Sequence, residues 1–162
     1  MIINLNGLKS YQEILDKAIC QKHNLNSKET INERILAFLV ELGELANETR
    51  CFKYWSIREA SETKIILEEY VDGIHFLTSL ANELDMTLEI EITESTKSLT
   101  SQFIDVFAFA GILEANFNQE NLSILINKYL VLGFSLGFNE ADIIAGYLAK
   151  NKINHQRQEE NY

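Results

Sequence analysis

The segment 31–46 reads INERILAFLVELGELA, and its apolar residues recur at the spacing expected for one face of an α-helix. The same period appears in five further segments: Leu8–Cys20, Ile65–Leu84, Phe103–Leu113, Leu122–Phe134 and Ile143–Ile153. Together they predict an all-α helical bundle of about five to six helices. Breaks are expected at Asn24-Leu-Asn-Ser and at Trp55-Ser-Ile-Arg, and Asn139 is the predicted N-cap of the last helix.

Two segments depart from an ordinary amphipathic helix. Thr87–Thr93 reads TLEIEIT, and its alternation predicts a short strand or an extended loop. Phe103–Leu113 reads FIDVFAFAGIL and is apolar almost all round, whereas a surface helix needs only an apolar stripe. Such a helix is either central in the bundle or shared between two protomers. We expect a homodimer, because a bundle of this size fully encloses few helices.

The composition indicates one acidic domain spanning residues 1–162. The chain has 14 basic and 24 acidic residues, a formal net charge of -10, 46% apolar residues and no proline. Such a chain can bury a sizeable core, and its charge opposes binding to nucleic acid or to an anionic membrane. We expect a cytoplasmic protein, because we find no secretory signal and no long apolar run. Cys20 and Cys51 form no C-x-x-C pair, so the cysteines indicate neither a disulfide framework nor a thiolate zinc site.

Two predicted helices each carry a pair of acidic residues at i,i+3 spacing, Glu41 with Glu44 and Glu69 with Asp72. Apolar residues flank Glu69 on its helix, so its carboxylate is expected to face the core side. Two carboxylates about 4 Å apart repel by roughly 4 kcal/mol at an effective dielectric near 20, and no basic residue lies beside the second pair. A bound cation is the remaining candidate, and carboxylates without His or Cys favour Mg²⁺ or Mn²⁺. Solvated helix faces often carry the same spacing, and that interpretation stays open.

Two further segments offer groups suited to a nucleotide. One side of the last predicted helix is basic and rich in amides, which suit phosphate oxygens and the edge of a nucleobase. It carries Tyr147, Lys150, Asn151, Asn154, Arg157 and Gln158. Cys51–Trp55 reads CFKYW and places a cation among aromatic rings on which a base can stack. A solvated terminal helix and ordinary aromatic packing are the alternatives.

These segments closely resemble a known family when read together. They are VELGELANETRCFKYW at 40–55, EEYVDGIHF at 68–76 and YLAKNKINHQRQ at 147–158, with YQEILD at 11–16 extending the similarity towards the N-terminus. The pattern is similar to that of the dimeric, all-α deoxyuridine triphosphatases (dUTPases). They belong to the wider all-α nucleoside triphosphate pyrophosphohydrolases, which include the MazG-type enzymes.

The resemblance implies an enzyme that hydrolyses dUTP to dUMP and pyrophosphate by attack of Mg²⁺-activated water, limiting uracil in DNA. It implies Glu41, Glu44, Glu69 and Asp72 as catalytic metal ligands that hold more than one Mg²⁺ ion, with Mn²⁺ as an alternative. Among these, Glu41 is expected to accept the proton of the water. It also implies a substrate-binding set: Gln12 and Trp55 near the uracil, His75 and Phe76 at the sugar, and Lys53, Lys150, Asn154 and Arg157 for the rest of the nucleotide.

The chain departs from the family pattern at Asn161, which stands before Tyr162 where the family usually has glycine. It also departs in the central region from Asp85 to Ser98, which is short and polar, so a reduced cap is expected there. dUDP is a second candidate substrate. Two alternative functions stay open at this point. One is a MazG-like hydrolase of broader nucleotide specificity, which would share the carboxylates. The other is a non-catalytic helical dimer whose acidic stripe is solvated.

Overall fold

The computed structural model describes residues 1–160, and within them the chain forms six α-helices and a two-stranded ribbon. The predicted all-α bundle is therefore confirmed. The elements are β1 (Ile2–Asn4), α1 (Asn6–His23), a short 3₁₀ turn (Ser27–Thr30), α2 (Ile31–Thr49), α3 (Thr63–Glu83), β2 (Glu89–Glu91), α4 (Leu99–Ala115), α5 (Gln119–Ser135) and α6 (Glu140–Glu159). Asn161 and Tyr162, on which the predicted departure from the family pattern falls, lie outside the described residues.

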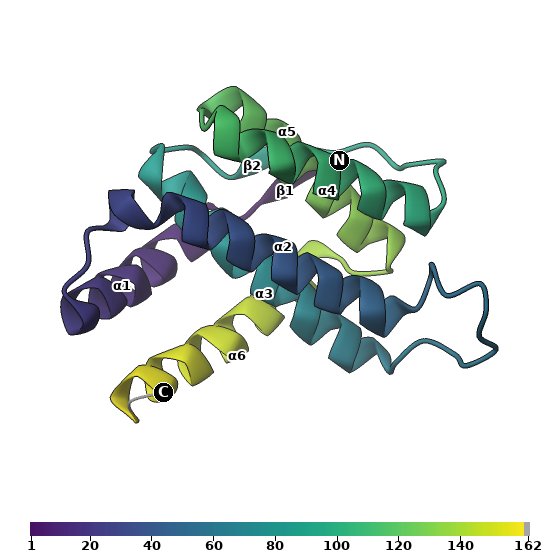
Figure 1. Cartoon of the computed structure of the whole chain (residues 1–162), viewed down its shortest axis with the longest axis horizontal. Coiled ribbons are helices and arrows are strands. Elements are labelled where there is room, and N and C mark those ends of the chain that lie inside the picture. The colour runs from purple at the N-terminus through teal and green to yellow at the C-terminus, as the bar shows by residue number, and fades with distance from the viewer. Residues whose placement is uncertain (161–162) are drawn as a thin grey trace.

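Helices α2 and α3 form the centre of the bundle. They pack against each other, while α1 and α6 contact α3 on one side and α4 and α5 contact the pair on the other. Figure 1 shows this arrangement, with the α4–α5 hairpin above the central pair and with α1 and α6 below it. As a result, α3 is covered on two sides, and its middle section is almost continuously buried.

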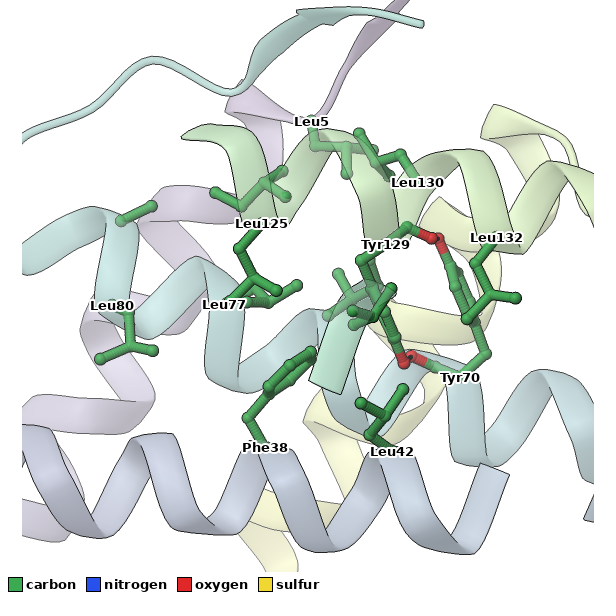
Figure 2. Packing of buried hydrophobic residues seen from close by; sticks show 14 of the residues in the cluster. Leu5, Phe38, Leu42, Tyr70, Leu77, Leu80, Leu125, Tyr129, Leu130 and Leu132 are labelled. Atoms are coloured by element: carbon green, nitrogen blue, oxygen red, sulfur yellow. Dashed lines mark hydrogen bonds between the residues drawn. The ribbon is translucent and has the colours of Figure 1, made fainter. Parts of the chain in front are cut away.

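The core contains a reciprocal tyrosine pair where α3 crosses α5 (Figure 2). The rings of Tyr70 and Tyr129 stack with centroids 4.6 Å apart. The Tyr129 hydroxyl donates to the backbone oxygen of Tyr70 at 2.8 Å, and the Tyr70 hydroxyl donates to that of Tyr129 at 3.2 Å. Phe38 of α2 packs edge-on against Tyr129. Both buried hydroxyls thus have partners, as buried polar groups require.

Two glycines make this close approach possible. A Cβ atom added at Gly73 would lie 2.1 Å from the Tyr129 hydroxyl oxygen, and one added at Gly133 would lie 2.3 Å from that of Tyr70. Each tyrosine hydroxyl therefore occupies the space above a glycine of the opposite helix. Both positions require glycine because no side chain fits there.

The helix ends agree with the predicted breaks. Asn24 ends α1 and Arg50 ends α2, both in the left-handed conformation. Asn139 caps α6 as expected, accepting a hydrogen bond from the Asp142 N–H while the Asp142 carboxylate accepts one from the Asn139 N–H. The alternating segment at 87–93 contains β2, so the strand interpretation is confirmed. Its partner β1 was not predicted. It pairs antiparallel with β2, placing Ile3 opposite Ile90.

Helix α4 is not enclosed by this chain. Phe103, Val106 and Ala110 are buried against the bundle, while Ile104 is 62% exposed and Phe107 and Ile112 also reach the surface. Of the two interpretations of this helix, a central position is therefore wrong. A face shared with a second protomer stays a prediction.

Within residues 1–160, no single helix is long and apolar enough to cross a membrane. Helices α5 and α6 satisfy the length and composition criteria only as a pair with a 105° bend between them.

Candidate active site

Three carboxylates meet where α2 packs against α3. Carboxylate oxygens of Glu41, Glu69 and Asp72 all lie within 4.8 Å of one another. The flanking residues explain this placement: Leu42 beside Glu41 and Tyr70 beside Glu69 are fully buried, which turns the acids towards the shared edge of the two helices. We call Glu41, Glu69 and Asp72 the acidic cluster. The fourth predicted acid, Glu44, is exposed and outside this group.

The carboxyl groups of the acidic cluster resist ionisation. Burial, followed by repulsion from Asp72, Glu44 and Glu69, raises the pKa of Glu41 to about 7. Burial and then the charge of Asp72 raise the pKa of Glu69, and burial likewise raises that of Asp72. Although exposed, Glu44 takes part in this repulsion at both Glu41 and Glu69. Such a group of acids favours a nearby positive charge.

Lys150 of α6 supplies one positive charge at the edge of the acidic cluster. Its ammonium lies 2.7 Å from Asp72 Oδ2 and 3.3 Å from Glu68 Oε1. Burial desolvates the ammonium and opposes its charge, but the hydrogen bond and the attraction to Asp72 outweigh this and raise the pKa of Lys150. One lysine balances only part of the negative charge of the acidic cluster and its neighbours.

A pocket of about 380 Å³ opens beside the acidic cluster, between α1, α2, α3 and α6. Its volume lies in the range typical of small-molecule sites. Glu41 and Asp72 form its acidic end. The remaining walls mix apolar and polar side chains, and include Gln12, Leu15, Asp16, Ile19, Arg34, His75, Phe76, Ser79, Asn154, Arg157 and Gln158. An acidic end joined to an amide- and arginine-lined cavity suits a ligand that carries both a base and phosphates.

The comparison with protein families gives a match over nearly the whole chain. A family model described as dUTPase matches residues 4–162. The chain belongs to the dUTPase family. It is an enzyme of the dUTP diphosphatase class, and the family resemblance expected from the sequence is confirmed. No curated protein matches the chain.

Most of the predicted nucleotide-binding residues of this dUTPase meet at one place. Gln12, His75, Phe76, Asn154 and Arg157 all line the pocket, and Lys150 lies at its acidic end. His75 is 4% exposed and stacks on the Tyr147 ring at 3.9 Å. Burial lowers the pKa of His75 to about 4, so its imidazole is neutral at physiological pH.

Lys53 and Trp55 are the predicted residues that the structure does not bring to the pocket. Both lie in the loop between α2 and α3. Trp55 is 65% exposed and contacts Tyr54 and Phe52 edge-on, and the Lys53 ammonium lies 5.5 Å from the centre of the Phe52 ring. Their role in binding nucleotide stays a prediction.

The pocket also contains residues that were not predicted as site residues, among them Asp16, Arg34 and Ser79. Asp16 accepts hydrogen bonds from Gln12 Nε2 at 2.8 Å and from the Ser79 hydroxyl at 2.7 Å. The Arg34 guanidinium donates to Ser79 Oγ at 3.0 Å and to Glu83 Oε1 at 3.1 Å. The sequence signals for Asp16 were its place in the segment 11–16 of the family resemblance and its position one helical turn after Gln12, which puts both side chains on the same face of α1.

Proposed function

We propose that this dUTPase hydrolyses dUTP to dUMP and pyrophosphate in the pocket beside the acidic cluster. The observation that carries the proposal is the acidic cluster itself, whose three carboxylates lie within 4.8 Å at one end of a cavity lined by Gln12, Asn154 and Arg157. In this proposal, the base and sugar of the nucleotide occupy the pocket, and its phosphates extend towards the carboxylates of the acidic cluster.

The residues present fit Mg²⁺. The acidic cluster offers only oxygen donors, which hard cations prefer, and burial and then the neighbouring negative charges raise the pKa of its carboxyl groups despite the nearby Lys150. Glu41, Glu69 and Asp72 would hold the ions, with Glu44 joining them at the exposed edge. When bound, such ions lower the pKa of water and offset charge on the phosphoryl group. Mn²⁺ fits the same ligands.

The chain's own residues have separate tasks in this proposal. Glu41, whose pKa is raised to about 7, accepts the proton of the attacking water. Lys150, held between Asp72 and Glu68, meets the phosphate chain together with Arg157. Asn154 closes over the nucleotide, while Gln12, His75 and Phe76 contact the uracil and sugar. Lys53 and Trp55 join the site from the loop after α2.

Pyrophosphate release tests this function directly. The full-length protein is incubated with dUTP, dTTP, dCTP and UTP, each with Mg²⁺ and with EDTA, and dUDP is added as a further substrate. We expect metal-dependent turnover that is strongest for dUTP. Equal turnover of all four triphosphates would instead support the broader specificity of the MazG-type enzymes. The absence of any turnover by a folded protein would contradict the proposal.

We also infer a homodimer that resides in the cytoplasm. The outward face of α4, formed by Ile104, Phe107 and Ile112, is apolar and exposed in the single chain, which is unusual for a face without a partner. Light scattering should give twice the chain mass of 18.6 kDa. Phe107→Arg should shift the mass towards the monomer, whereas the same mass for both proteins would argue against this face as the interface.

A further inference from the structure

A buried hydrogen-bond chain runs along the pocket wall from α6 to α3. The Tyr147 hydroxyl donates to Gln12 Oε1 at 2.6 Å, and Gln12 Nε2 donates to Asp16 Oδ1 at 2.8 Å. The other oxygen of Asp16 accepts from the Ser79 hydroxyl at 2.7 Å. Gln12 is 4% exposed and Tyr147 is fully buried, so water does not compete for the bond between them, and the two bonds to Asp16 are partly buried. Gln12 and Asp16 are one turn apart on α1, and the fold brings Tyr147 of α6 and Ser79 of α3 to them.

This chain of bonds fixes which way the Gln12 amide faces. A carboxylate only accepts hydrogen bonds, so Asp16 holds the amide nitrogen, and the amide oxygen turns to the donors on the opposite side. There it meets the Tyr147 hydroxyl and, at 2.9 Å, His75 Nδ1, which donates in the matching tautomer. In the reverse orientation the Gln12 oxygen would face the Asp16 carboxylate, and two acceptors would repel each other.

The orientation decides what the amide offers to a ligand. Its oxygen has two donors already, and its nitrogen has two N–H groups, of which Asp16 takes one. Since Gln12 lines the pocket, the second N–H remains for the ligand. An N–H donor binds a carbonyl oxygen, as at position 4 of uracil, and opposes the amino group at the same position of cytosine. The arrangement separates these two bases and makes no distinction between uracil and thymine.

We propose that Asp16 is a positioning residue that selects uracil over cytosine by holding the Gln12 amide nitrogen towards the pocket. Asp16 itself need not touch the nucleotide. This inference rests on the proposed function, because it assumes that dUTP binds with its base against Gln12. Arg34 supports the arrangement from behind, since its guanidinium donates to the Ser79 oxygen that in turn donates to Asp16.

The test compares kcat/KM for dUTP with kcat/KM for dCTP in wild type and in Asp16→Asn. The asparagine has the same shape but can accept or donate, so the Gln12 amide can adopt both orientations. We expect the dUTP-to-dCTP ratio to fall about tenfold or more, because a site built to pair with a polar group rejects its mismatch strongly. A loss of folded protein cancels in this ratio, since both substrates meet the same preparation.

Two further variants make the result decisive. Glu13→Gln makes the same change of charge at an exposed position of α1, and we expect its ratio to match wild type. Tyr147→Phe removes one of the two donors to the Gln12 oxygen, and a smaller fall in the ratio is expected even if Asp16→Asn does not fold. Equal losses for dUTP and dCTP in both pocket variants, or an equal shift in Glu13→Gln, would overturn the inference. If wild type itself does not hydrolyse dUTP, the proposed function fails first.

Discussion

The polar groups on the two sides of α3 differ in whether the fold itself provides their partners. On the side that faces α5, the hydroxyls of Tyr70 and Tyr129 each find a backbone oxygen, and Gly73 leaves room for the contact. On the side that faces α2 and α6, Glu69 and Asp72 meet Glu41, and Lys150 forms an ion pair with Asp72. The first arrangement is complete within the fold, while the second leaves carboxylates that a bound cation would neutralise.

One side of α3 therefore contributes mainly to stability, and the other side carries the residues proposed for function. Fully paired groups at the tyrosine crossing stabilise the fold, since an unpaired buried hydroxyl costs about 1–3 kcal/mol. Mutually repelling carboxylates in the acidic cluster destabilise the fold, and a bound cation would relieve the repulsion. Substitutions on the two sides are therefore expected to give opposite results, with activity lost on one side and stability lost on the other.

The largest effect is expected for Glu69→Gln in the acidic cluster. The substitution removes a charged oxygen donor, and we expect kcat/KM for dUTP to fall about a hundredfold or more, because the ion and the phosphoryl charge are less well held. Removing one of the repelling charges should leave the melting temperature without Mg²⁺ unchanged or raise it. Steady-state pyrophosphate release and thermal melting measure the two quantities.

A matched control for this variant is Glu33→Gln, an exposed position on α2. It makes the same change of charge away from the acidic cluster and should retain wild-type activity. If Glu69→Gln keeps full activity, or if it unfolds the protein as a core substitution would, the assignment of the two sides of α3 is wrong.

The next effect is expected on the opposite side, for Gly73→Ala. Its new methyl group would lie 2.1 Å from the Tyr129 hydroxyl oxygen, so the crossing of α3 and α5 must shift. Overpacking of this kind typically costs about 1–3 kcal/mol. Urea unfolding should therefore show a lower midpoint, while the uracil preference of the folded protein is retained.

Gly43→Ala, on the helix α2 that carries Glu41, is expected to stabilise the protein where Gly73→Ala destabilises it. Apart from its chain neighbours and the adjacent backbone of α2, no heavy atom in the described chain lies within 4 Å of the added methyl group, and alanine favours a helix over glycine by about 0.5–1 kcal/mol. We expect this variant to be slightly more stable than wild type. Equal destabilisation by both substitutions would show that the tyrosine crossing has no special requirement for glycine.

The sequence predicted the features that arise from local periodicity. All six helices follow from apolar spacing, and the start of α6 after Asn139 follows from its capping side chain. The acidic cluster was predictable for a similar reason, since i,i+3 spacing places Glu69 and Asp72 on one face. In these cases the residues that decide the structure are close together in the chain.

Features that depend on distant residues were not predictable. The strand β1 is three residues long and exists because β2, more than eighty positions later, pairs with it. Asp16 is one of many acids until the fold brings Ser79, 63 positions later, to one of its oxygens. The exposed position of Trp55 likewise depends on the path of the loop after α2, which no periodic pattern specifies.

The smallest expected effect is a dependence of stability on pH at Glu41. Burial and then repulsion raise its pKa from 4.5 to about 7, so the folded protein keeps a proton that the unfolded chain loses. The stabilisation is fully present below about pH 4.5 and is lost as the pH rises through 7. Glu41→Gln lacks this titration. In EDTA, its melting temperature should therefore rise relative to wild type between about pH 5 and pH 8.

The difference in melting temperature between wild type and Glu41→Gln does not depend on the titration of His75. Burial lowers the pKa of this imidazole to about 4, so its contribution has the opposite sign and is lost as the pH falls below about 6.5. Because both proteins contain His75, its contribution cancels. With Mg²⁺ at pH 8, wild type should instead have the higher melting temperature of the two proteins. A ligand at a hundred times its dissociation constant adds about 2.7 kcal/mol to the folded state that binds it. If the difference in melting temperature does not change with pH, Glu41 ionises in the folded protein as freely as in water. The carboxylates at the contact of α2 and α3 would then not repel one another enough to favour a bound ion.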